Sequence, residues 1–208
     1  MKTISRMSRW FGALAALLLL AVVPFTLTSC GDDDDDALLM FDGVKITPTS
    51  TELYDYWISE NAEGSVKCYY AYLYGTTEDG MKCRIGFDFH SGLFGKTKSL
   101  TDDLTWYNTA SGDNYGNGWV GFWLEEYDEE DGYWYDYDSY WTDEDGFKSG
   151  TISVNLKDGK FIVNTQGVTY DDEAFNFKFS GKYKKVESSA KVKGEVKAKV
   201  QAKAKAKK

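Results

Sequence analysis

Few residues of this chain could act as an acid, a base, a nucleophile or a metal ligand in a recognisable pattern. His90 is the only histidine, so a Ser-His-Asp arrangement or a histidine-containing zinc site would have to use it. The sequence has no Gly-x-Ser-x-Gly motif, no phosphate-binding glycine loop and no Cys and His spacing typical of metal sites. We therefore predict no catalytic residue, no metal site and no cofactor, and we interpret His90 as a surface residue at a strand end.

Acidic side chains are abundant enough to suggest two other kinds of chemistry. A pair of carboxylates can hydrolyse a glycosidic bond, and several carboxylate oxygens together can bind Ca²⁺. The acids of this chain lie mostly in runs, such as residues 128–131 and 143–145, and neither run has the spacing of an EF-hand loop. We interpret these runs as solvated turns and keep a hydrolase only as the third of three functional hypotheses.

Aromatic side chains offer a further kind of chemistry, which is ring stacking. The chain has 15 Tyr, 12 Phe and 7 Trp, and residues 119–141 are especially rich in them. A hairpin that turns symmetrically at 128–132 would pair Tyr127 with Tyr133, Trp123 with Tyr137 and Trp119 with Trp141. Together with Tyr135, these residues would share one face. That face is either core or an exposed platform for sugar rings, formed by Trp119, Trp123, Tyr137 and Trp141.

The elements that position these residues are predicted to be strands. Short runs rich in aromatic and β-branched residues alternate with turn residues, and no segment after residue 30 shows a helical period. Residues 91–105 are the least regular and are predicted to hold a long loop or a short helix. The cleanest alternation lies in 152–156, 161–165 and 175–183, which predicts a C-terminal meander. We predict an all-β fold, an antiparallel sandwich or barrel of roughly 8–10 strands.

Charge divides the chain into three parts. Residues 1–29 carry three basic groups and no acid, residues 30–186 carry 31 acidic and 13 basic side chains, and residues 187–208 carry eight Lys and two Glu. The central part, at −18, repels nucleic acid at long range, so we exclude a nucleic-acid-binding function. The tail alternates Lys with Ala or Val and is predicted to be disordered, with a surface polyanion or the acidic body as its alternative partners.

The N-terminus has the order of a secretory signal peptide. A basic region at 1–9 precedes an apolar run at 10–27, and small residues follow. Leu27-Thr28-Ser29-Cys30 resembles the bacterial lipobox, and the following Asp32, Asp33, Asp34, Asp35 and Asp36 resemble the export signal of Bacteroidota surface lipoproteins. The resemblance implies that Cys30 carries the lipid and that the protein is anchored in the outer membrane, facing the extracellular side.

The body of the chain carries the same resemblance. The segments DGVK at 42–45, ELYDYW at 52–57 and YAYLY at 70–74 are similar to the start of small uncharacterised Bacteroidota surface lipoproteins. Their C-terminal half is similar to GTISV at 150–154, DGKF at 158–161 and FSGKY at 179–183. The likeness covers about 42–186 and implies an all-β cell-surface module, without an activity.

With Cys30 used for the lipid, Cys68 and Cys83 remain. An even pair in an exported protein suggests a disulfide. If the turn between them is centred on 75–80, however, Cys83 faces Tyr72 rather than Cys68, and four strand residues span about 13 Å, too far for a bridge. A disulfide and two free thiols both stay open.

These observations define four segments and three hypotheses. The segments are a signal peptide (1–29), a lipidated acidic tether (30–40), an all-β domain (41–186) and a Lys- and Ala-rich tail (187–208). The leading hypothesis is a non-enzymatic binding module on the outer membrane surface, with a glycan as ligand. The second is a structural or adhesin-like surface protein without a small ligand, and a hydrolase is the third.

Overall fold

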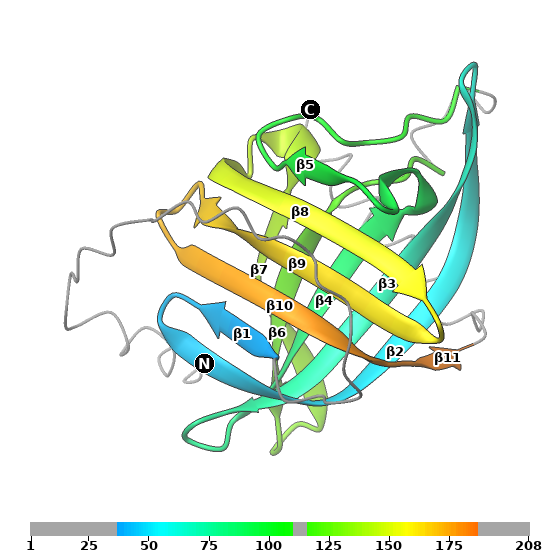
Figure 1. Ribbon diagram of the computed structural model, residues 1–208. Helices are drawn as coiled ribbons and strands as arrows, with labels where there is room; N and C mark the ends of the chain where they lie inside the picture. The colour runs from blue at the N-terminus through cyan, green and yellow to red at the C-terminus, as the bar shows by residue number, and fades with distance from the viewer. Residues whose placement is uncertain (1–36, 110–115, 187–208) are drawn as a thin grey trace. The chain divides into compact units, whose positions relative to one another are not determined.

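The computed structural model describes residues 37–109 and 116–186, which form an all-β fold (Figure 1). The strands are β1 (Leu38–Phe41), β2 (Val44–Asn61), β3 (Gly64–Thr77), β4 (Lys82–His90), β5 (Thr97–Ser99), β6 (Gly121–Asp128), β7 (Tyr133–Trp141), β8 (Phe147–Lys157), β9 (Lys160–Thr169), β10 (Ala174–Lys182) and β11 (Lys184–Val186). Two short 3-10 helices, η3 (Ser91–Leu93) and η4 (Thr142–Glu144), follow β4 and β7. The predicted all-β class is confirmed.

All eleven strands of the described part belong to one sheet, a few more than the predicted 8–10. The order is β5-β8-β9-β10-β1-β2-β3-β4-β6-β7, and β11 pairs with β2. Neighbours are antiparallel except for the short β11, which runs parallel to β2. The end strands β5 and β7 are not paired with each other, so the sheet is open. Of the two predicted architectures, the sandwich is therefore the better description.

The turn between β8 and β9 has the backbone conformation that its sequence favours. Asp158 and Gly159, between β8 and β9, both have positive φ angles, as a two-residue hairpin turn requires. The resulting β8-β9-β10 meander was predicted from the alternation and is confirmed. Strand β2 runs through Pro48 without ending there. A register shift between Pro48 and Ser50 lets the strand continue past a residue that cannot donate to the ladder.

The main core lies between the two halves of the curved sheet. In Figure 1, β8, β9, β10 and β1 form the layer nearest the viewer, and β4, β6 and β7 lie behind it. Rings from the two layers meet: the Phe87 and Phe161 centroids are 5.9 Å apart, and those of Phe122 and Phe175 are 4.8 Å apart. Burial of apolar side chains, among them these rings, is the main driving force for folding.

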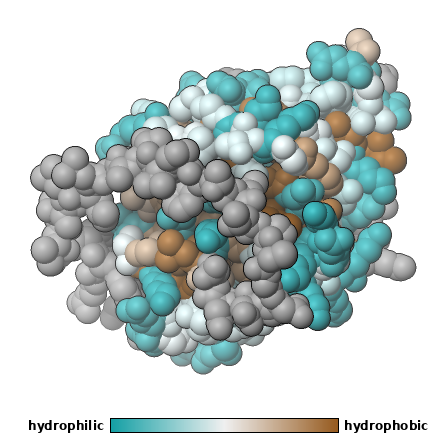
Figure 2. All heavy atoms as spheres, viewed as in Figure 1, coloured by the Kyte–Doolittle hydropathy of each residue, from teal (hydrophilic) through white to brown (hydrophobic). Residues whose placement is uncertain are grey.

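The outward surface of the meander is polar, as the alternation predicts. Thr151 and Ser153 of β8 alternate with the buried Ile152 and Val154. Hydrophilic and weakly polar residues accordingly cover much of the surface over β5 and β8 in the space-filling view (Figure 2). This half of the sheet therefore buries one face only.

Cys68 and Cys83 are both buried, free thiols. Cys68 pairs across the ladder with His90, whereas Cys83 pairs with Gly75, seven residues further along β3. Cys83 points into the main core, and Cys68 lies on the opposite face. Of the two alternatives, the disulfide is wrong. Burial raises the pKa of the Cys83 thiol to about 11 and also raises that of Cys68, so neither thiol is reactive at neutral pH.

The predicted signal peptide, Cys30, Asp32–Asp36 and the tail 187–208 lie outside the described residues. The sheet begins at Leu38, so the last residues of the segment predicted as a tether, 38–40, belong to β1. Within 37–109 and 116–186, no helix is long and apolar enough to cross a membrane.

Candidate functional site: the outer aromatic face

A second aromatic cluster lies on the sheet face opposite the main core. Along β4, Ile85 and Phe87 point into the core, so Arg84, Gly86 and Asp88 lie on the other face. We call this other face of β2, β3, β4, β6 and β7, together with Trp119, the outer aromatic face. Its aromatic residues are Tyr54, Tyr56, Tyr70, Tyr72, Tyr74, Trp119, Trp123, Tyr127, Trp134 and Trp141.

The β6-β7 hairpin that builds part of this face has a different register from the predicted one. Tyr127 pairs with Trp134, Trp123 with Ser139 and Gly121 with Trp141. The turn is shorter than a symmetric turn at 128–132, and an extra residue, Tyr137, forms a bulge opposite Leu124 and Glu125. Because side chains alternate, these two changes redistribute the aromatic residues between the faces.

The predicted platform is therefore only partly correct as a grouping. Trp119, Trp123 and Trp141 share the outer aromatic face, but Tyr137 packs against the main core. Trp119 and Trp123 are buried, and Trp141 is partly exposed. Of the two alternatives, core describes Trp119 and Trp123, whereas Trp141 is exposed enough to contact a ligand. Trp134 also lies on this face, beside Tyr127, although the predicted register placed it on the opposite one.

Trp123 lies at the buried centre of the cluster. Its indole lies over Gly86 of the neighbouring strand, where an added Cβ would be 2.0 Å from the ring. The ring contacts Tyr70 and Tyr72 at centroid distances of 4.9 and 5.6 Å, and Trp141 stacks on it at 6.0 Å. Trp123 is 1% exposed and is covered by the partly exposed Trp141.

Arg84 holds the other end of the layer. Its guanidinium lies 4.3 Å from the Tyr72 ring centroid and 4.5 Å from that of Trp134, and it forms an ion pair of 2.5 Å with Glu125. Burial alone would lower the pKa of Arg84, but the hydrogen bond and the charge of Glu125 outweigh it, so the pKa is raised. The positive charge is therefore permanent and locally neutralised.

Tyrosine hydroxyls satisfy two further carboxylates of this face. Glu52 accepts hydrogen bonds from Tyr54 (2.9 Å) and Tyr74 (3.0 Å), and the buried Asp88 accepts one from Tyr56 (2.9 Å). Burial and the nearby carboxylates raise the pKa values of all three tyrosines, so they stay protonated donors. These bonds fix the ring orientations within the layer.

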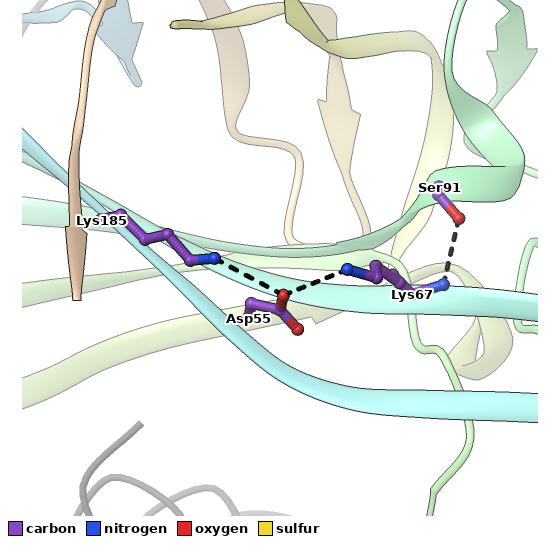
Figure 3. A network of polar contacts seen from close by, with 4 residues as sticks. All are labelled: Asp55, Lys67, Ser91 and Lys185. Atoms are coloured by element: carbon purple, nitrogen blue, oxygen red, sulfur yellow. Dashed lines mark hydrogen bonds and ion pairs between the residues drawn. The ribbon is translucent and has the colours of Figure 1, made fainter. Parts of the chain in front are cut away.

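Strand β11 covers the edge of this face at β2. Lys185 of β11 and Lys67 of β3 both approach the same Asp55 oxygen, at 3.9 and 3.5 Å, and the Lys67 backbone N–H donates to the Ser91 hydroxyl (Figure 3). These ion pairs are exposed and contribute little individually. Val186 adds an apolar contact with the outer cluster, which anchors the end of the described chain there.

Exposed groups lie between the two partly exposed indoles of β7. Trp134, Asp136, Ser139 and Trp141 follow one another on the outer side of this strand, and Asp136 and Ser139 are exposed. A partly exposed aromatic ring can stack on the apolar face of a sugar, and carboxylate and hydroxyl oxygens can accept hydrogen bonds from sugar hydroxyls. The arrangement can therefore bind a polyhydroxylated ligand at the open edge of the sheet.

His90 is buried, at 3% exposed, so its prediction as a surface residue is wrong. Its Nδ1 accepts the Gly92 backbone N–H at 3.2 Å, and its Nε2 lies 2.9 Å from the Leu104 carbonyl oxygen, to which it donates. Desolvation lowers its pKa, so the ring is neutral. The residue ties the loop after β5 to the end of β4, a contact that the local sequence did not indicate.

Three acids meet beside the start of β10, two of them from the acidic run 171–173 and the third from β7. Side-chain oxygens of Asp138, Asp171 and Glu173 lie within 4.8 Å of one another. Glu173 also accepts hydrogen bonds from the Tyr140 and Thr169 hydroxyls, and burial raises its pKa. Such oxygens suit a hard cation, but exposed acidic groups often cluster without one. Asp138 is distant from the other two acids in the sequence, so the sequence gave no signal for the cluster.

The fold and this face define an all-β protein with an aromatic, acid-flanked outer surface. Comparisons of the chain with models of protein families, with curated proteins and with solved structures gave no match.

Proposed function

We propose that the chain is a lipoprotein of the outer membrane surface whose β domain binds glycans through the outer aromatic face, without catalysing a reaction. Cys30 and the acidic run Asp32–Asp36 support the location by their resemblance to known export signals. The observation that carries the binding function is the pair of partly exposed indoles, Trp134 and Trp141, beside the exposed Asp136 and Ser139. The outer membrane, through the N-terminal lipid, and a glycan are the proposed partners.

The rigidity of the aromatic layer favours binding over a merely structural role. Trp141 stacks on the buried Trp123, and Trp134 lies over the Arg84 guanidinium. Rings held in this way lose little conformational freedom when a ligand arrives, so more of the stacking energy contributes to affinity. An adhesin-like protein without a small ligand would not need ordered, partly exposed rings beside hydrogen-bonding groups.

A glycan array probed with the purified full chain in detergent tests this function. We expect binding to at least one polysaccharide, reduced about tenfold or more by Trp134→Ala or Trp141→Ala, because each change removes a stacking ring. Tyr170→Ala is the matched control, since Tyr170 is an exposed aromatic residue (65%) between β9 and β10. Absence of binding to every glycan, or equal loss with the control, would refute the proposal.

A further inference from the structure

The bulge in β7 places two stacking residues on the same face that regular alternation would separate. Trp134 and Trp141 are seven positions apart, an odd number, so in an uninterrupted strand they would point to opposite sides. The extra residue, Tyr137, restores both indoles to the outer aromatic face. The bulge thereby creates a row of outward-facing residues, Trp134, Asp136, Ser139 and Trp141, with an indole at each end. Tyr137 itself turns toward the core.

The length of this row follows from its partners on β6. Trp134 lies opposite Tyr127 and Trp141 opposite Gly121, six residues apart. At about 3.3 Å per strand residue, the backbone positions of the two tryptophans are about 20 Å apart along the strand. One sugar ring is of the size of a single aromatic side chain and cannot touch both. The exposed groups between them, Asp136 and Ser139, face whatever bridges this distance.

The charges along the row disfavour an acidic ligand. The Arg84 guanidinium is paired with Glu125, and the Lys82 ammonium is paired with Glu129 at 2.8 Å. Asp136, in the centre of the row, is an exposed carboxylate. A uronic acid or sulfated sugar placed there would meet a carboxylate without gaining a cation, whereas neutral hydroxyl groups can donate to it.

We propose that the ligand is a neutral, extended glycan chain that lies along β7 and stacks on Trp134 and Trp141 at once. This inference rests on the proposed function and specifies its ligand. A single sugar or a chain end occupies only one of the two rings and binds correspondingly more weakly. A chain that spans both rings gains the second contact without a second loss of translational freedom.

Binding to neutral oligosaccharides of increasing length tests the inference. Purified full chain is titrated with gluco- and manno-oligosaccharides from the monosaccharide to the octasaccharide, and with oligogalacturonates as acidic counterparts. We expect the affinity for one neutral series to rise about tenfold or more once the oligomer spans both indoles. The oligogalacturonates should bind more weakly at every length.

Ser139→Arg is the informative variant, because it places a bulky side chain between the rings and leaves the aromatic layer intact. It should weaken the binding of long oligomers about tenfold or more, and it should weaken that of short ones, which occupy a single indole, by a clearly smaller factor. Ser180→Arg, at an exposed serine on the outward side of β10, is the matched control and should change neither. Melting temperatures of both variants verify that the fold is retained.

Two results would overturn the inference while leaving the proposed function in place. One is equal affinity for short and long oligomers, with Ser139→Arg acting on both alike. The other is tighter binding of oligogalacturonates than of any neutral series. If instead the unmodified chain binds no saccharide of either kind on this panel or on the array, the proposed function itself is wrong.

Discussion

At the residue scale, Arg84 shows how a charge is held in an aromatic layer. Its side chain is 14% exposed and that of Glu125 is 5% exposed, so each depends on the other for solvation. Attraction within such a pair is offset by the loss of water, and removing one partner leaves an uncompensated buried charge. The stacking of Tyr72 and Trp134 on the guanidinium adds an interaction that lysine would not reproduce.

Arg84→Met should therefore lower the free energy of unfolding by ~3–5 kcal/mol, mainly because the buried Glu125 carboxylate loses its ion pair with Arg84. The double variant Arg84→Met, Glu125→Leu should regain much of this loss, because neither charge of the pair remains. Urea denaturation of the three proteins measures both effects. A double variant less stable than the single one would show that the ion pair is not the source of the cost.

His90 gives the chain a defined pH dependence. Because its pKa in the folded protein lies below the value of ~6.5 in unfolded chains, the unfolded state takes up the proton more readily. Its contribution to stability is thus fully present above pH ~6.5 and is lost as the pH falls from there toward the folded pKa. Protonation would also set an Nδ1 proton against the Gly92 N–H.

The difference in unfolding free energy between the unmodified chain and His90→Gln should shrink as the pH falls from neutral to mildly acidic values. Since His90 is the only histidine, the variant lacks this titration while the carboxylates titrate in both proteins. Denaturation at several pH values measures the difference. A constant difference across the range would contradict the role assigned to His90.

At the element scale, the pairing of β4 with β6 depends on a glycine facing a tryptophan. Gly86 lies opposite Trp123, and the indole occupies the space that a Cβ would need. Small-to-large changes in a packed site typically cost 1–3 kcal/mol, because side chains and backbone must shift. The ladder is therefore specified by a size match as well as by backbone hydrogen bonds.

Gly86→Ala should destabilise the chain by about 1–3 kcal/mol, and Trp123→Ala by ~3–5 kcal/mol. The double variant should be more stable than the sum of the two losses predicts, because removal of the indole relieves the clash. Urea denaturation of the four proteins gives this coupling energy. Simple additivity of the two losses would mean that the ring does not constrain position 86.

At the scale of the whole molecule, the proposed lipid anchor would hold the β domain at the membrane surface through a short acidic segment. Cys30→Ala should abolish labelling by a palmitate analogue and leave an uncleaved or released protein. Alanine at Asp32–Asp36 should retain the label and reduce digestion by external protease, because the chain would remain on the inner side. Undiminished labelling of the first variant, or unchanged digestion of the second, would contradict the respective assignment.

Much of the fold could be predicted from local sequence. The alternation in 152–156, 161–165 and 175–183 determined the meander, because a strand with one buried face must repeat with period two. The turn at Asp158-Gly159 was equally predictable, since few pairs of neighbouring residues both adopt positive φ angles. The aromatic content of 119–141 indicated β6 and β7, two of the five strands that build the outer aromatic face.

Only the tertiary structure decided which aromatic residues lie together. The bulge at Tyr137 changes the face of every residue on one side of it, and no local signal distinguishes a bulge from a one-residue shift in the turn. Likewise, the burial of His90 and the separation of Cys68 from Cys83 depend on strands and loops distant in sequence. Alternation is a property of each strand, so the sequence by itself determined it. Register and burial arise from contacts between strands, so only the assembled sheet decided them.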